Sequence, residues 1–125
     1  MPELPDVTVY VERLDALLAG AVLERIELRS PFVLRSVEPP ASAFEGIAFR
    51  AVRRLGKQIA LGFAEERWCV IHLMIAGRLR WLTGARKPPA ITLAVFHFSA
   101  GRLALTEAGS KKRASLHLAE GPEAL

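Results

Sequence analysis

The chain has 125 residues, of which 51% are apolar and 24% charged, which is ordinary for one globular domain with a hydrophobic core. It has no apolar run long enough to span a bilayer, and its acidic N-terminus does not match a secretory signal. The net charge of +4 and a pI near 9.8 favour an anionic partner, nucleic acid first.

The single cysteine, Cys69, excludes an internal disulfide and a zinc cluster. It lies in an apolar run, so we interpret it as a buried small hydrophobe rather than a reactive thiol. An intracellular, reducing setting fits this cysteine usage.

Apolar residues at helical spacing predict one helix near the start of the chain, over residues 6–19. Pro5 and Asp6 suit its first turn and Gly20 suits its end. The apolar positions are Val7, Val11, Leu14, Leu17 and Leu18. The positive end of this helix is therefore expected beside Pro2 and Glu3.

After Gly20 the pattern changes to short strands separated by Gly, Pro and Ser, which predicts a sandwich or a barrel. The run 68–75 is almost continuously apolar, as in a strand that is covered on both faces. The tail 119–125 is predicted to be a linker or a frayed end. The strands are expected over residues 22–28, 32–36, 47–53, 58–63, 68–75, 78–82, 91–98, 102–106 and 113–118.

The first residues carry possible chemistry of their own. Removal of Met1 would make Pro2 the N-terminus, with a free secondary amine that can attack an electrophilic carbon and form an iminium. Glu3 could move protons at the same centre. If Met1 is retained, the Pro2 nitrogen is an amide and cannot react. The alternative is a plain N-terminal arm that leads into the helix.

Three segments, in this order, resemble the N-terminal domain of the bacterial formamidopyrimidine-DNA glycosylase and endonuclease VIII family. Residues 1–7 are close to the family's Pro-Glu-Leu-Pro-Glu-Val start. Residues 53–58 are close to its Arg-Arg-x-x-Lys segment, and residues 71–80 to its Ile-His-Leu-Gly-Met-Ser-Gly-x-Leu-Arg segment. The resemblance covers the whole chain and implies a two-sheet antiparallel β-sandwich with one N-terminal helix.

The resemblance also implies base-excision repair of oxidised bases in damaged double-stranded DNA, with glycosylase and abasic-site lyase activities. By position, Pro2 would attack the sugar C1′, Glu3 would act as acid and base, and Lys57 would contact phosphates beside the lesion. Asp6 stands where the family has glutamate, as a possible supporting acid of shorter reach. A monomer in the bacterial cytoplasm, associated with the nucleoid, is expected. The sequence leaves the preference between oxidised purines and pyrimidines open.

Two segments depart from the family pattern at residues that contact DNA. Ile75 stands where the family has the methionine that fills the gap left by a flipped base, and it could be a wedge or a core strand residue. Met74 is expected to point to the opposite face of the strand. Thr106–Arg113 replaces the family's Thr-Asp-Pro-Arg-Arg-Phe-Gly and lacks the phenylalanine. Candidates for DNA contacts are Ile75, Arg78, Lys111, Lys112 and Arg113, each of which could instead be a solvated or core position.

Complete family members continue into a helical DNA-binding half and a zinc finger. We expect the sandwich to occupy residues 1–118, and we expect no metal site or cofactor in this chain, since zinc belongs to the missing finger. His72 is interpreted as a hydrogen-bonded structural residue. The alternative to the enzyme is a divergent or truncated DNA-binding module with little catalysis, or a fragment that retains only the scaffold.

Overall fold

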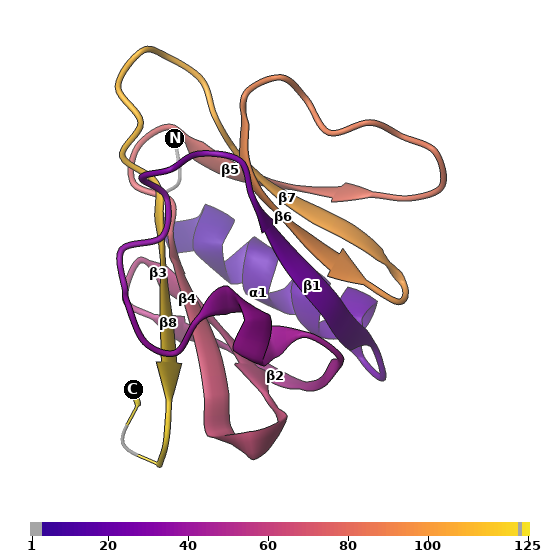
Figure 1. Ribbon diagram of the computed structural model, residues 1–125. Helices are drawn as coiled ribbons and strands as arrows, with labels where there is room; N and C mark the ends of the chain where they lie inside the picture. The colour runs from indigo at the N-terminus through magenta and orange to yellow at the C-terminus, as the bar shows by residue number, and fades with distance from the viewer. Residues whose placement is uncertain (1–3, 123) are drawn as a thin grey trace.

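The computed structural model describes residues 4–122 and 124–125, with side chains from Val7 onward. One α-helix, α1 (Leu4–Leu18), precedes eight strands, as Figure 1 shows. The strands are β1 (Val22–Leu28), β2 (Ile47–Leu55), β3 (Gln58–Phe63), β4 (Arg67–His72), β5 (Gly77–Leu82), β6 (Thr92–Phe98), β7 (Gly101–Glu107) and β8 (Ser115–Glu120). Two short 3₁₀ turns, η1 (Ala41–Phe44) and η2 (Ala64–Glu66), lie between strands.

All neighbouring strands are antiparallel, in the order β5-β7-β6-β1-β2-β3-β4-β8. The β1–β2 junction is formed by only two residue pairs, Val22 with Ala48 and Leu23 with Ile47. The strand order therefore divides at this junction into the halves β5-β7-β6-β1 and β2-β3-β4-β8. The predicted class, a mainly β sandwich with one N-terminal helix, is confirmed.

The core lies between the helix and the two halves of the sheet. Helix α1 buries Val7, Leu14 and Leu18, at the spacing that the sequence predicts. Phe63 contacts three further rings, those of Phe44, Phe49 and Phe98, at centroid distances of 5.8–6.4 Å. Each fully buried side chain of this size contributes about 1.5–3 kcal/mol. Phe49 and Phe63 pair at the end of β2 and β3 opposite the β2–β3 turn, so this ring cluster packs that far end of the sandwich.

Several predicted bounds differ from the structure, and three of these differences change how a segment is described. Residues 32–36 form only a single parallel bridge, between Leu34 and Leu116, rather than a strand. The apolar run 68–75 is a strand only as far as His72, because residues 74–76 form a turn. Strand β8 extends to Glu120, two residues into the segment that was predicted to be a linker. Within the described part of the chain, no helix has the length and apolar character needed to cross a membrane.

Candidate nucleic-acid interface

A tight turn joins β4 to β5 and presents two apolar side chains. The Gly77 N–H donates to the Leu73 carbonyl at 2.9 Å, and Met74 adopts a φ of 59°. A Cβ atom on Gly77 would lie 2.3 Å from the Leu73 oxygen, so only glycine fits there. Met74 and Ile75 are 37% and 72% exposed. Ile75 is therefore not a core strand residue, and the two side chains do not alternate across a strand as expected, because both residues lie in a turn.

Arg78, a predicted DNA contact, folds back onto this turn. Its Nη1 donates to the carbonyls of Gly77 at 2.7 Å and Ile75 at 3.1 Å. A guanidinium has five N–H donors, so others remain for an anion. Arg78 thus stabilises the turn and places positive charge beside Ile75.

The β7–β8 loop, residues 108–114, carries the other predicted cations. Lys111, Lys112 and Arg113 are all exposed. Lys112 Nζ donates to the Glu107 main-chain carbonyl. Among the described residues, the side chains of Lys111 and Arg113 have no hydrogen bond or ion pair, so these two cations of the loop have no partner within the protein.

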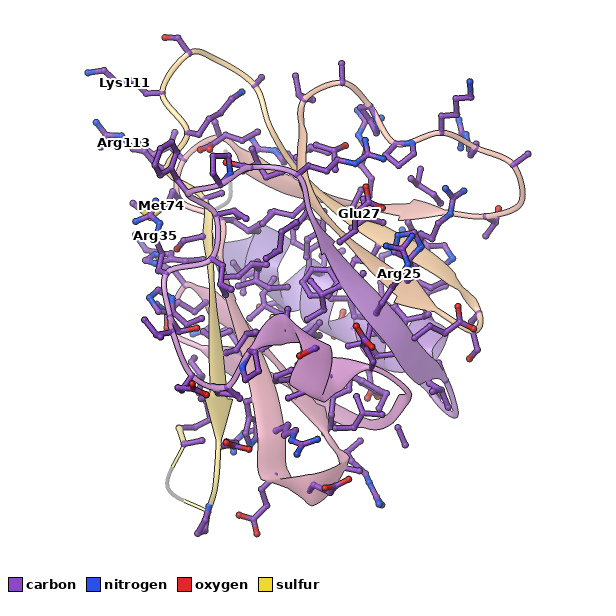
Figure 2. All side chains as sticks on the ribbon, in the orientation of Figure 1. Arg25, Glu27, Arg35, Met74, Lys111 and Arg113 are labelled. Carbon is purple, nitrogen blue, oxygen red and sulfur yellow. The ribbon has the colours of Figure 1, made fainter. Side chains whose placement is uncertain are left out.

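The sheet register brings the turn and the loop to one edge of the molecule. Gly77, at the start of β5, pairs with Glu107, at the end of β7. His72, at the end of β4, pairs with Ser115 at the start of β8 and with Gln58 at the start of β3. In Figure 2, Lys111, Arg113 and Met74 project from the same side of the molecule. We call this set of loops the loop edge: residues 56–57, 73–78 and 108–114.

Lys57 lies at the tip of the two-residue β2–β3 turn, where its side chain is exposed. Because Gln58 pairs with His72, this tip lies at the same end of the sheet as the β4–β5 turn. His72 Nδ1 is 3.3 Å from Gln58 Nε2, which supports its interpretation as a structural residue. The register therefore places Lys57 at the loop edge.

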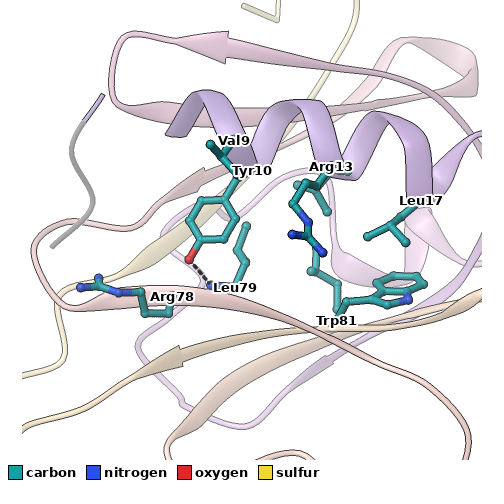
Figure 3. A pocket seen from close by; sticks show the side chains of 9 residues that line it. Val9, Tyr10, Arg13, Leu17, Arg78, Leu79 and Trp81 are labelled. Carbon is teal, nitrogen blue, oxygen red and sulfur yellow. Dashed lines mark hydrogen bonds between the residues drawn. The ribbon is translucent and has the colours of Figure 1, made fainter. Parts of the chain in front are cut away.

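Helix α1 begins at this same end. The Tyr10 hydroxyl accepts a hydrogen bond of 3.4 Å from the Leu79 N–H, whereas Leu17 lies toward Trp81, farther along β5 (Figure 3). The start of α1 is therefore directed toward the β4–β5 turn. Pro2 and Glu3 lie outside the described residues, and Asp6 is described only as backbone in the first turn of α1.

A cavity of about 570 Å³ lies between α1 and β5 (Figure 3). Among the described residues, its lining contains no carboxylate and no histidine, so it offers no acid–base pair and we assign it no catalytic role. The lining residues are Val9, Tyr10, Arg13, Leu14, Leu17, Arg78, Leu79, Trp81 and Leu103.

A polar network that sequence reasoning missed lies apart from the labelled loop-edge residues, on β1 and β6 (Figure 2). Glu27 accepts from Arg29 Nε at 2.6 Å, and its other oxygen is 2.8 Å from His97 Nε2. These hydrogen bonds, that of Arg29 first, hold the pKa of Glu27 below its ordinary value. Residues 25, 27 and 29 alternate along one strand face, which is the sequence signal that could have located the network.

Other titratable groups have structural surroundings. Burial raises the pKa of the Cys69 thiol, as expected for a buried small hydrophobe. Arg53 lies over the Trp68 ring at 5.8 Å, so its charge is engaged on the sheet surface. In the part of the chain that the structure describes, no group of three or more His, Cys, Asp or Glu could hold a metal ion.

These features define a β-sandwich domain with an N-terminal helix and a basic loop edge. The model of the formamidopyrimidine-DNA glycosylase N-terminal domain matches residues 1–114. The formamidopyrimidine-DNA glycosylase of Paraburkholderia phymatum is 38% identical over 92 residues, which cover 72% of this chain and 33% of that protein. Its counterpart from Desulfitobacterium hafniense is 30% identical over 128 residues, covering 100% of this chain and 46% of that protein.

Solved structures share the fold. The Lactococcus lactis FPG (MutM) in complex with DNA containing FAPY-dG has a TM-score of 0.84 at 20% identity, covering 93% of this chain and 43% of that one. MutM in complex with DNA containing carbocyclic 8-oxo-G has a TM-score of 0.85 at 22% identity, covering 94% and 43%. The chain belongs to the formamidopyrimidine-DNA glycosylase family and represents its N-terminal domain. It spans between one third and one half of the length of these relatives.

Proposed function

We propose that this chain is the catalytic N-terminal domain of a base-excision-repair DNA glycosylase that also cleaves abasic sites. Its partner is damaged double-stranded DNA, and it acts as a monomer in the bacterial cytoplasm. The observation that carries the proposal is the convergence of Lys57, the β4–β5 turn and the β7–β8 loop at the end of the sheet where α1 begins.

The proposed chemistry starts at Pro2 once Met1 has been removed. The nitrogen lone pair forms a bond to C1′ of the damaged nucleotide and the nitrogen gives up its proton. The glycosidic bond breaks as the base leaves with the electron pair of that bond and takes up a proton. Ring opening gives an iminium, and elimination then breaks the bond to the 3′-phosphate. Glu3 transfers the protons at the sugar. The residues of this chain supply the nucleophile and the proton transfers.

Charge at the start of α1 supports an unprotonated nucleophile. A free α-amino group titrates near physiological pH, and the positive end of a helix disfavours a further positive charge nearby. The exposed Ile75 supports the removal of a base from the stack, because apolar side chains can occupy the space that the base leaves. Damaged or mispaired bases cost less to extrude, which favours lesions over normal pairs.

Borohydride trapping on a duplex with an abasic site tests the proposal. Protein without Met1, verified by intact mass, is expected to form a covalent adduct. The variants Pro2→Gly and Met1-retained protein are expected to form none, while Arg86→Ala, on the exposed β5–β6 loop, retains the adduct. Absence of any adduct from the verified Met1-free protein contradicts the proposal.

A divergent DNA-binding module is a second candidate function. It is favoured by the composition of the β7–β8 loop, which lacks the phenylalanine of the family pattern. This candidate predicts DNA binding that weakens with salt, as expected for phosphate contacts, and no trapped adduct. The same trapping experiment, paired with a binding titration, therefore separates the two functions.

A further inference from the structure

Glu107 is a buried carboxylate at the base of the basic β7–β8 loop. It is 2% exposed, and no other charged side chain in the described part of the chain is buried. One oxygen, Oε1, accepts the N–H groups of Arg113 at 2.7 Å and Ala114 at 3.1 Å, and Oε2 is 3.2 Å from the Ala114 N–H. A single side chain thus joins the residue before the loop to the residues that end it.

The backbone of Glu107 joins the same loop to the rest of the loop edge. Its carbonyl accepts from Lys112 Nζ, and its N–H donates to the Ile91 carbonyl at 3.1 Å. It also pairs with Gly77, the residue that closes the β4–β5 turn. The exposed apolar turn and the exposed cations are therefore fixed relative to each other through this one residue.

We infer that Glu107 is a positioning residue for DNA binding, which holds Lys111 and Arg113 at the phosphate backbone beside the β4–β5 turn. The inference rests on the proposed function. A buried charge is retained only where hydrogen bonds stabilise it, and these bonds all serve to close the loop. Fixing the loop before binding lowers the entropy lost when its side chains meet phosphates.

For a substitution of Glu107, the loss of charge and the loss of loop closure predict opposite changes in DNA affinity. Glu107→Gln removes one negative charge beneath a cationic loop, so electrostatics alone should tighten the binding of DNA. The same change replaces an acceptor oxygen by an NH₂ group that faces the Ala114 N–H, which weakens the loop closure. Positioning therefore predicts weaker binding, and the sign of the change distinguishes the two effects.

The experiment measures the affinity of the 125-residue chain for a short duplex with a stable abasic-site analogue, as a function of salt. Glu107→Gln is expected to bind about three- to tenfold more weakly, the range for coupled neighbours. Its log–log salt slope should fall by about 0.9 for each phosphate that the variant no longer neutralises. The matched control is Glu24→Gln, the same charge change at an exposed position on β1, which should bind as tightly as wild type or more tightly.

A double-mutant cycle tests whether the effect acts through the loop. Arg113→Ala should weaken binding in wild type but have much less effect in Glu107→Gln, whereas Lys57→Ala should have equal effects in both backgrounds. Hydrogen exchange of the Arg113 and Ala114 amides should accelerate in Glu107→Gln without DNA. Faster exchange with unchanged or tighter DNA binding overturns the inference. A wild-type chain that binds no DNA at low salt overturns the proposed function and the inference with it.

Discussion

Two of the three loops at the loop edge, the β4–β5 turn and the β7–β8 loop, reach a fixed shape by different means. The β4–β5 turn is closed by backbone, through the Gly77 N–H and the absence of a Cβ atom beside the Leu73 carbonyl. The β7–β8 loop is closed by a side chain, through the Glu107 carboxylate. Closure of the β4–β5 turn depends on Gly77, which lies in a segment that resembles the family pattern. Closure of the β7–β8 loop depends on Glu107, which lies in the segment that departs from that pattern.

This difference shows which positions of the two loops are required for their closure. A turn that leaves no space for a Cβ atom tolerates little substitution at Gly77, whereas its closure does not depend on the side chain of Ile75. The closure of the β7–β8 loop depends instead on one carboxylate at its base and not on the side chain of Lys111 or Arg113. Substitutions in and around the two loops test this contrast.

The largest expected effect is that of Gly77→Ala. The added methyl group would meet backbone atoms of Leu73, which cannot move aside as a side chain can. We expect the free energy of unfolding to fall by about 3 kcal/mol, at the upper end for overpacking. Urea denaturation measures it. The control Gly84→Ala has open space around the new Cβ atom and a φ of +60°, so it should cost about 1 kcal/mol. Equal losses in the two variants would refute the account of the turn.

The next effect is that of Glu107→Ala, which leaves the Arg113 and Ala114 N–H groups without their acceptor. We expect the free energy of unfolding to fall by about 2 kcal/mol, since a buried N–H that loses its partner costs about 1–3 kcal/mol and the loop can admit water. Thermal unfolding measures the loss. Lys111→Ala, in the same loop but without a hydrogen bond or ion pair among the described residues, should change the stability by less than about 0.5 kcal/mol. A loss of stability in Lys111→Ala as large as that in Glu107→Ala would be inconsistent with closure by the carboxylate.

A smaller effect is expected from Ile75→Ala, and in binding rather than in stability. Ile75 is 72% exposed, so its truncation should leave the midpoint of unfolding nearly unchanged. Affinity for a duplex with an abasic-site analogue should fall about fivefold, because about 1 kcal/mol of apolar burial against the DNA is removed. Val37→Ala, at an even more exposed apolar residue away from the loop edge, should bind normally. If both variants bind alike, Ile75 has no role in the complex.

The smallest effect concerns Glu27, away from the loop edge. Because its folded-state pKa is depressed, its contribution to stability is present above the ordinary glutamate pKa and is lost as the pH falls through the folded-state pKa. For a partly exposed network we expect about 0.5 kcal/mol. Glu27→Gln should reduce the acid dependence of stability below about pH 4.5 and leave DNA binding at neutral pH unchanged. An unaltered pH profile in the variant would contradict this role.

The regular elements were largely predictable because periodicity reports burial. The α1 stripe of Val7, Leu14 and Leu18 follows directly from spacing, and the bounds of β1 and β3 follow from the glycines that precede them, Gly20 and Gly56. The end of β4 was not predictable in this way, because Met74 and Ile75 continue an apolar run into an exposed turn. A hydrophobic pattern cannot distinguish a residue that is buried in a protein from one exposed at a candidate site of contact with DNA.

The candidate site was predictable only in its residue types. Motif positions indicated Lys57, Ile75, Arg78 and the cations at 111–113, but the segments meet only through strand register, which is a tertiary property. Glu107 gave no local signal beyond one acid at the end of an apolar strand, since its partners are backbone N–H groups six and seven residues later. The roles of Pro2 and Glu3 stay predictions.

Amide chemical-shift mapping during titration with an abasic-site duplex tests most directly whether the loop edge meets DNA. The largest shifts should cluster at residues 56–57, 73–78 and 108–114 and should diminish as salt is added, while the amides of Arg25, Glu27 and His97 stay unchanged. Shifts centred on β1 and β6, with the loop edge silent, would contradict a DNA-binding role for these three segments.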